Sequence, residues 1–255
     1  MASTNRVSGF DVTRQVVDEV AGWVQRLSKS LVPAKAIPYG DDFRWVFADE
    51  SALVLAVAKA VRIASALEAS VVLLDKGFIL EAACLMRIVS DYSAEILAVC
   101  EGELRKQHTK AQREFISQFF ARKPIEPNPQ PPEKQRFVGR DDLLKAHVRL
   151  GDAAGVDGGS FRDMKRTLDF GYDGYVHGSY SSAMELYDGR ANEFMLCGDV
   201  DPEQQRIYFT AFAGKVHEAA VACGFIALIE RDAELHAAIG NALCRLNESN
   251  DQSLD

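Results

Sequence analysis

Apolar residues at helical spacing run through most of residues 44–122, and this run limits the fold more than any other feature of the sequence. Between about residues 44 and 74, Val54, Val57 and Val61 recur on one face, and other apolar side chains cover much of the remaining surface. A helix that is apolar nearly all round is buried on several sides. Gly77 follows this stretch, where a glycine can take the left-handed conformation that ends a helix.

A second long helix is expected from Phe78 toward residue 122, because Phe78, Leu85, Tyr92 and Val99 step by sevens. The two helices predict an antiparallel αα-hairpin at the centre of a helical bundle. The sequence contains no alternating strand pattern of any length, so the expected fold class is all-α. Further helices are expected at 11–31, 138–151, 160–170, 172–187 and from 202 to about 246.

The last of these stretches carries a helix start signal. Asp201 is suited to the N-cap, Pro202 to the first helical position, and Gln204 to the completion of a capping box. By contrast, residues 123–136 hold five of the eight prolines and predict an extended loop. We expect a single helical domain over residues 1–255, in which this loop separates the hairpin portion from a C-terminal helical portion. The loop is interpreted as a spacer, with a ligand for SH3-type domains as the alternative.

The cysteines and the charge indicate the compartment and the partners. Five cysteines without short paired spacing, three of them in apolar helical runs (Cys84, Cys100 and Cys223), predict free thiols that act as small hydrophobes in a reducing compartment. The polar N-terminus and the charges within the apolar runs predict a cytoplasmic protein that does not bind a membrane. A net charge of −8 opposes nucleic-acid binding without excluding a local basic patch. No metal or cofactor is expected. The extensive apolar surface of the two long helices predicts a homo-oligomer.

Arg87 and Asp91 form the first candidate site, because they stand four residues apart on a mostly apolar helix. They could be a solvated ion pair that contributes about 0.3–0.5 kcal/mol. Alternatively, a helix packed on several sides could bring them into a buried polar pocket, which would need polar partners.

Residues 172–180 form the second candidate site, because three tyrosines, Asp173 and His177 crowd into this segment. Asp173 and His177 are spaced i,i+4, and an aspartate can fix the tautomer of an imidazole and leave its other nitrogen as acid, base or donor. A histidine hydrogen-bonded within a helix contact is the simpler interpretation. The glycines of the segment permit close approach of backbones. We therefore expect His177 to lie within reach of Arg87 and Asp91, and Tyr175 to belong to the same ligand-binding site.

The residues of these two segments resemble a group of all-helical bacterial proteins of unknown function described as HEPN-like. The resemblance spans residues 50–185 and is carried by the stretch 81–87 (EAACLMR) and by 175–179 (YVHGS). It implies a helical bundle in which Arg87 and His177 face a common site. It implies no established activity.

HEPN ribonucleases are recognised by an arginine followed after four to six residues by a histidine. Arg231 to His236 satisfies this pattern with four intervening residues, and Arg140 to His147 satisfies it with six. A histidine could deprotonate a ribose 2′-hydroxyl while an arginine stabilises the phosphorane charge, without a metal. The same spacing also describes ordinary charge on a helix surface. The sequence thus favours a binding or assembly role at Arg87 and His177, with a metal-independent ribonuclease that uses Arg231 and His236 as the alternative.

Overall fold

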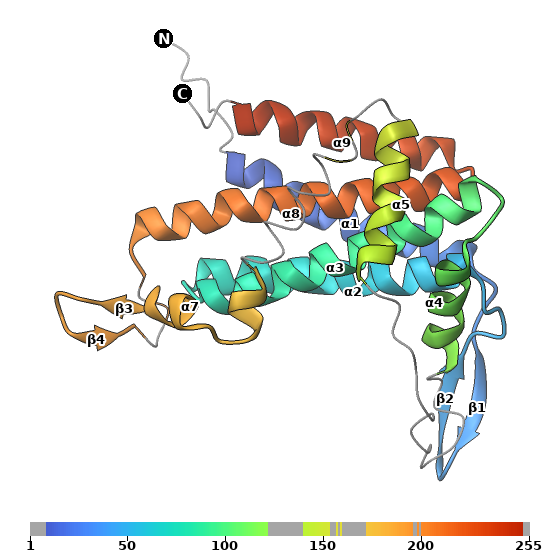
Figure 1. The fold of residues 1–255 in the computed structure, drawn as a ribbon, viewed down its shortest axis with the longest axis horizontal. Helices are drawn as coiled ribbons and strands as arrows, with labels where there is room; N and C mark the ends of the chain where they lie inside the picture. Colours follow the sequence, from blue (N-terminus) through green and yellow to red (C-terminus); the bar gives the residue numbers. More distant parts are fainter. Residues whose placement is uncertain are drawn as a thin grey trace.

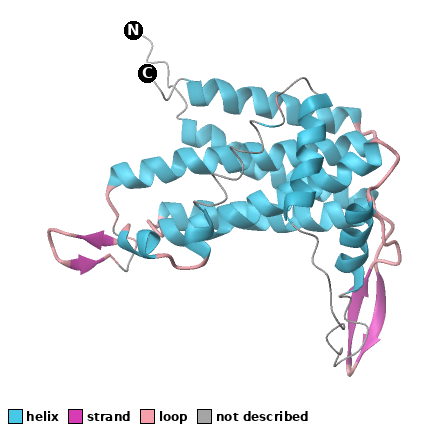
Figure 2. Cartoon of the chain, viewed as in Figure 1, coloured by secondary structure: helices cyan, strands magenta, loops and turns pink. Residues whose placement is uncertain are grey.

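The computed structural model describes residues 9–121, 140–153, 157, 159, 172–195, 198 and 200–251. Its elements are helices and two short hairpins (Figure 2), and the expected all-α helical bundle is confirmed. The elements, in chain order, are α1 (Gly9–Ser30), β1 (Lys35–Tyr39), β2 (Asp42–Val46), α2 (Ala52–Asp75), α3 (Ile79–Leu104), α4 (Lys110–Ala121), α5 (Arg140–Ala153), α7 (Tyr180–Met184), β3 (Tyr187–Asp188), β4 (Glu193–Phe194), α8 (Pro202–Ile229) and α9 (Ala233–Asp251).

The long helices α2 and α3 pack against each other as the predicted hairpin, and Figure 1 shows them on the side of the bundle opposite α9. α8 packs along α3, while α1 packs against α2, α8 and α9. α4 and α5 lie across the end of the bundle where α3 finishes (Figure 1). One cluster of buried apolar side chains extends from α1 to α9. Cys100 and Cys223 belong to it, as expected for small hydrophobic thiols.

The turn between α2 and α3 ends α2 as its glycine predicts. Gly77 has φ +77°, and the N–H of Phe78 donates to the Leu73 carbonyl at 2.9 Å, which closes the last turn. Gly198 packs backbone to backbone against this turn, and its own φ is +76°. A Cβ atom on Gly77 would lie 1.8 Å from the Gly198 carbonyl oxygen, so neither position accepts a side chain without displacement.

α8 is the one described helix that is long and apolar enough to cross a membrane. However, 61% of its most apolar window is buried inside the bundle. The core helices of soluble proteins share this property, so α8 is compatible with the expected soluble protein.

The prediction that a helix starts near Arg44 is wrong. Residues 42–46 form β2, which pairs in antiparallel fashion with β1 around Gly40 and Asp41. Gly40 has φ +64°, the conformation that a two-residue hairpin turn needs at its first position. The helix begins only at Ala52, where the Ser51 hydroxyl accepts the Val54 N–H at 3.3 Å.

The second long helix is also shorter than predicted, because α3 ends at Leu104 and α4 begins at Lys110. Lys106 adopts a positive φ of 54° in the break. Thr109 and Gln112 then form a capping box, in which each side chain bonds the backbone N–H of the other, at 2.7 and 3.2 Å. The Thr-x-x-Gln spacing was the sequence signal for this new helix start.

The stretch 172–187 is not one helix. Residues 172–176 form a helical turn that ends at Gly178, which has φ +62°. Ser179 then caps α7 by accepting the N–H of Ser182 at 3.3 Å, and β3 follows. β3 pairs in antiparallel fashion with β4, Tyr187 opposite Phe194 and Asp188 opposite Glu193.

The start of α8 follows its sequence signal only in part. Asp201 caps α8 by accepting the Glu203 N–H at 2.8 Å, and Pro202 opens the helix, both as predicted. The prediction that Gln204 completes a capping box is wrong, because its side chain donates to the Glu185 carbonyl at 3.1 Å. The residues expected to form a helix at 160–170, and the proline-rich segment 123–136, lie outside the described residues.

Candidate functional site

Arg87 on α3 is the centre of a cluster of charges that joins three segments of the chain. Its Nε donates to Asp173 Oδ1 at 2.8 Å, and its Nη1 pairs with Asp91 one turn further along α3. The Arg87 side chain is only 9% exposed, whereas those of Asp91 and Asp173 are 42% and 41% exposed. The cation is therefore buried, and its two carboxylates connect it to the surface.

Close backbone contacts hold Asp173 in this position. The Ser179 N–H donates to the Gly174 carbonyl at 2.8 Å, and the Ser182 hydroxyl donates to the same oxygen at 3.0 Å. A Cβ atom on Gly174 would lie 2.9 Å from the Ser179 hydroxyl oxygen. Glycine is thus the residue that lets the helical turn 172–176 fold back against α7.

A buried polar triangle lies beside Arg87, between α3 and α8. Lys215 Nζ donates to Ser90 Oγ at 2.8 Å and to Glu218 Oε1 at 2.6 Å, and Ser90 Oγ donates to Glu218 Oε2 at 2.6 Å. Ser90 is 0% and Lys215 is 3% exposed. The Lys215 ammonium also lies 4.8 Å from the centre of the Tyr172 ring, a cation–π contact.

The chemistry of this triangle favours structure or binding over nucleophilic catalysis. A serine nucleophile needs a base that can take its proton and a path to the substrate. Ser90 donates its hydroxyl hydrogen to the Glu218 carboxylate but is fully buried, so a substrate has no path to it, and Lys215 Nζ donates to the same carboxylate. We call Arg87, Ser90, Asp91, Asp173, Lys215 and Glu218 the Arg87 cluster.

Tyr175 lies next to the Arg87 cluster but turns toward a different carboxylate. Its hydroxyl donates to Glu185 Oε1 at 3.0 Å and lies 2.9 Å from the hydroxyl of Tyr208, which also contacts Glu185. Burial raises the pKa of Tyr175 and that of Tyr208, so both phenols are neutral donors at physiological pH. Burial likewise raises the pKa of Tyr172 to about 12.

The structure brings together part of the predicted ligand-binding site. Arg87 and Asp91 form the expected pair, and Asp173 of the 172–180 segment joins them. His177 is exposed, and its backbone N–H donates to the Asp173 carbonyl at 3.0 Å. Thus the segment reaches Arg87 through the Asp173 carboxylate, and His177 stands one helical turn away on the surface.

Sequence reasoning missed Lys215 and Glu218. Their signal was the occurrence of two charged residues, spaced i,i+3, inside the apolar run of α8. A lysine and a glutamate at this spacing on a buried helix can pair with each other and with a polar residue of the neighbouring helix.

The residues of the alternative ribonuclease site lie beyond the C-terminal end of α8. Arg231 is exposed in the α8–α9 turn with φ +58°, and His236 follows in the first turn of α9. His236 borders an apolar pocket of about 140 Å³, whose lining contains no arginine. The other lining residues are Val221, Gly224, Phe225, Leu228, Ile239, Gly240 and Leu243. In the second match, Arg140 opens α5 and His147 is buried on the same helix, 4% exposed.

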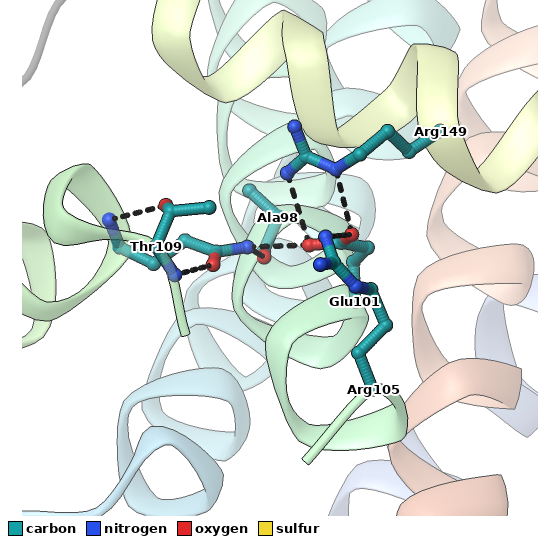
Figure 3. A network of polar contacts seen from close by, with 6 residues as sticks. Ala98, Glu101, Arg105, Thr109 and Arg149 are labelled. Atoms are coloured by element: carbon teal, nitrogen blue, oxygen red, sulfur yellow. Dashed lines mark hydrogen bonds and ion pairs between the residues drawn. The ribbon is translucent and has the colours of Figure 1, made fainter. Parts of the chain in front are cut away.

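A second charged network lies near the end of α3 (Figure 3). The buried Glu101 carboxylate accepts from Arg149 at 2.7 and 3.0 Å, from Arg105 at 2.9 Å and from Gln112 at 2.7 Å. Gln112 also donates to the Ala98 carbonyl at 2.5 Å. Burial by itself would raise the pKa of Glu101, but these hydrogen bonds outweigh it and lower the pKa to about 2. This network ties α4 and α5 to α3.

Within the described residues, no group of three or more histidine, cysteine, aspartate or glutamate side chains is placed to hold a metal ion. Comparison with known proteins gives no match to a family model, to a curated protein or to a solved structure.

Proposed function

We propose that the protein is a cytoplasmic helical protein with a binding role, and that its ligand site is the Arg87 cluster together with His177. The observation that carries this proposal is that the buried Arg87 guanidinium contacts two carboxylates that reach the surface. Arg87 is 9% exposed, yet it contacts two aspartates that are each about two-fifths exposed. His177 stands exposed one turn from Asp173.

The energetics of the Arg87 cluster support a role beyond stability. Taking charges out of water costs several kcal/mol per ion, and well-packed apolar replacements of buried ion pairs are commonly neutral or stabilising. Arg87 and Lys215 are both nearly buried in a helix contact that is otherwise apolar. A cluster of nearly buried cations whose carboxylates are partly exposed to solvent is suited to recognition of a polar ligand.

A thermal-shift screen tests the proposal. The probes are nucleotides and short single-stranded RNAs, applied to the wild type, to His177→Ala and to His236→Ala. We expect a probe that raises the melting temperature of the wild type to lose its effect in His177→Ala and to keep it in His236→Ala. The two histidines are both exposed, which makes the second variant a matched control. A probe response that survives His177→Ala contradicts the proposal.

The second candidate function is a metal-independent HEPN-like ribonuclease that uses Arg231 and His236. It is supported by the position of His236 at an open pocket, one helical turn beyond the loop that carries Arg231. Cleavage of RNA in the presence of EDTA, lost in both His236→Ala and Arg231→Ala, is the expected result. Cleavage that persists in both variants would assign the activity to other residues or to a contaminant.

We also propose that the protein forms a homo-oligomer. Several large apolar side chains are exposed on the bundle and on the β1–β2 hairpin, among them Trp45 (67%), Val72 (61%) and Leu228 (43%). Exposed apolar surface favours association with a partner. Light scattering at micromolar concentration tests this, and a monomer contradicts it.

A further inference from the structure

Tyr172 and Asp173 cover one side of the Arg87 cluster. The Tyr172 hydroxyl donates to Met86 Sδ at 3.9 Å, and the ring lies 4.8 Å from Lys215 Nζ. Asp173 accepts from Arg87 Nε at 2.8 Å. Met86 is 0% and Lys215 is 3% exposed, whereas the Asp173 side chain is 41% exposed. Tyr172 and Asp173 therefore lie between the buried cations and the solvent.

These two residues open a segment, residues 172–195, whose parts are bonded to one another. The Gly174 carbonyl accepts from the N-cap residue of α7 and from a serine within α7. The Tyr175 hydroxyl donates to Glu185 Oε1, just beyond α7, at 3.0 Å. β3 and β4 then pair with each other in the same segment. The segment is thus built to move as one body.

Polar and aromatic side chains attach this segment to the bundle. In the described part of the chain, α7, β3 and β4 pack extensively against no bundle helix, and the β3–β4 hairpin projects from the bundle (Figure 1). At α8, the Tyr208 hydroxyl donates to the Glu185 carboxylate, and the Gln204 side chain donates to the Glu185 carbonyl at 3.1 Å. The segment also touches the core through side chains that are only partly buried, those of Tyr172, Tyr175 and Leu186.

Such an attachment breaks more easily than the core of the bundle. Water screens the Arg87–Asp173 ion pair on its exposed side, and ion pairs of this kind contribute little to stability. Proteins open locally, in contiguous units, where few buried apolar contacts hold a segment. Residues 172–195 can therefore open while the bundle stays folded.

We propose that residues 172–195 form a lid, which opens as one body and gives a ligand access to the Arg87 cluster. Opening breaks the ion pair between Arg87 and Asp173 and moves the Tyr172 ring away from the Lys215 ammonium. The Tyr208 hydrogen bond to the lid holds it closed against α8. This inference rests on the proposed ligand site, because it explains how a ligand reaches cations that are nearly buried.

Chemical labelling of a buried thiol measures the opening of the lid. Met86→Cys places a thiol beneath Tyr172 and leaves every member of the Arg87 cluster unchanged. Cys100 and Cys223, which are 1% and 0% exposed, remain as references for unfolding of the core. Three other cysteines are replaced by Cys84→Ser, Cys197→Ser and Cys244→Ser.

The reagent is methyl methanethiosulfonate, and peptide mass spectrometry follows the modification of each thiol. We expect the thiol at position 86 to react at least about tenfold faster than Cys100 and Cys223, because local opening requires less free energy than unfolding of the core. The three rates are compared within one molecule, so a loss of global stability raises them alike. Circular dichroism confirms that the variant is folded.

Tyr208→Phe should accelerate this labelling. The substitution removes a hydrogen bond to the Glu185 carboxylate, so the thiol at position 86 should react about tenfold faster relative to the core thiols. Tyr187→Phe is the matched control, because the Tyr187 hydroxyl donates to Asn192 Oδ1, at 2.6 Å, within the lid. Its loss should leave the relative rate unchanged.

Two labelling outcomes overturn the lid. Equal rates at position 86, Cys100 and Cys223 would mean that this position is reached only when the core unfolds. A faster rate at position 86 that Tyr208→Phe leaves unchanged would mean that a different movement exposes the thiol.

The lid and the ligand site fail separately, because labelling uses no ligand. Labelling as expected, without a thermal-shift response to any nucleotide or RNA probe, supports the lid and contradicts the ligand site. Labelling that follows core unfolding, together with a probe response lost in His177→Ala, refutes the lid and supports the ligand site.

Discussion

The Arg87 cluster and the Glu101 network are two ways in which one helix buries charge. They lie about four helical turns apart on α3. A carboxylate has about four acceptor positions, and Glu101 receives four donors, two from Arg149 and one each from Arg105 and Gln112. The Glu101 carboxylate is thus fully satisfied inside the protein, whereas the Arg87 cluster continues to the surface through half-exposed carboxylates.

Burial of a charge therefore does not by itself indicate a functional site. Both regions contain a nearly buried ion and a perturbed environment. The Glu101 network joins α3, α4 and α5, and every acceptor position of its carboxylate is used by a donor inside the protein. A structural role therefore accounts for the network. The Arg87 cluster holds two nearly buried cations, and two of its carboxylates, those of Asp91 and Asp173, are about two-fifths exposed to solvent.

The largest expected effect comes from Glu101→Gln. The substitution preserves shape but removes the charge that holds Arg105 and Arg149, and it directs an amide group toward their donors. We expect a loss of about 3 kcal/mol in the free energy of unfolding, measured by urea denaturation. Glu103→Gln, on the same helix with a side chain that is 39% exposed, is the control and should change little. A loss below about 1 kcal/mol would mean that the Glu101 network is no more important for stability than the Arg87 cluster.

The pH dependence of stability should also reveal the role of Glu101. Glu101 has a folded pKa of about 2, lowered from 4.5. A group with a lowered folded pKa binds more protons in the unfolded state, so its stabilisation is present above pH 4.5 and is lost as the pH falls toward 2. Unfolding titrations should show a steeper decline over this range in the wild type than in Glu101→Gln. Equal slopes would mean that another carboxylate governs the acid transition.

Arg87→Met should have a smaller effect on stability. Methionine fills the apolar part of the site, and the partly exposed Asp91 and Asp173 can be solvated by water. We expect a loss of about 1 kcal/mol in urea denaturation. Any probe response found for the wild type should disappear. A destabilisation equal to that of Glu101→Gln would mean that the Arg87 cluster, like the Glu101 network, serves mainly to stabilise the fold.

The smallest effect on stability is expected for His177→Ala. The side chain is exposed, and substitutions at such positions usually change the free energy of unfolding by no more than about 0.5 kcal/mol. The variant should therefore melt within a few degrees of the wild type while losing its ligand response. A large drop in melting temperature would show that His177 supports the 172–176 turn rather than a ligand.

The sequence predicted the long helices because their apolar periodicity is sustained over many turns. It did not predict β1 and β2, since Trp45 was assigned to the start of a helix, whereas it alternates with Phe43 along a strand. A strand of five residues gives too short a pattern to compete with the helical run that follows. The sequence also failed to predict the end of α3, because the break between α3 and Thr109 contains no proline. The Thr109–Gln112 capping box, which marks the start of α4, was overlooked.

Local spacing also limited the prediction of the candidate site. Arg87 and Asp91 are neighbours on one helix, so their pairing follows from sequence alone. Arg87 meets Asp173 across 86 positions, and Lys215 meets Ser90 across 125. Such contacts depend on how helices pack, and no local pattern encodes the rotation of α8 that turns Lys215 toward Ser90.

The backbone contact between Gly77 and Gly198 has a consequence for the order in which a nascent chain can fold. The α2–α3 hairpin is synthesised early, but the segment that packs on its turn, and the α8 helix that covers α3, are made near the end. Until then the face of α3 that carries Ser90, which hydrogen-bonds Lys215 and Glu218 of α8, has no cover. This face of α3 therefore stays exposed while the second half of the chain is translated. The risk of aggregation is greatest in the period before α8 leaves the ribosome.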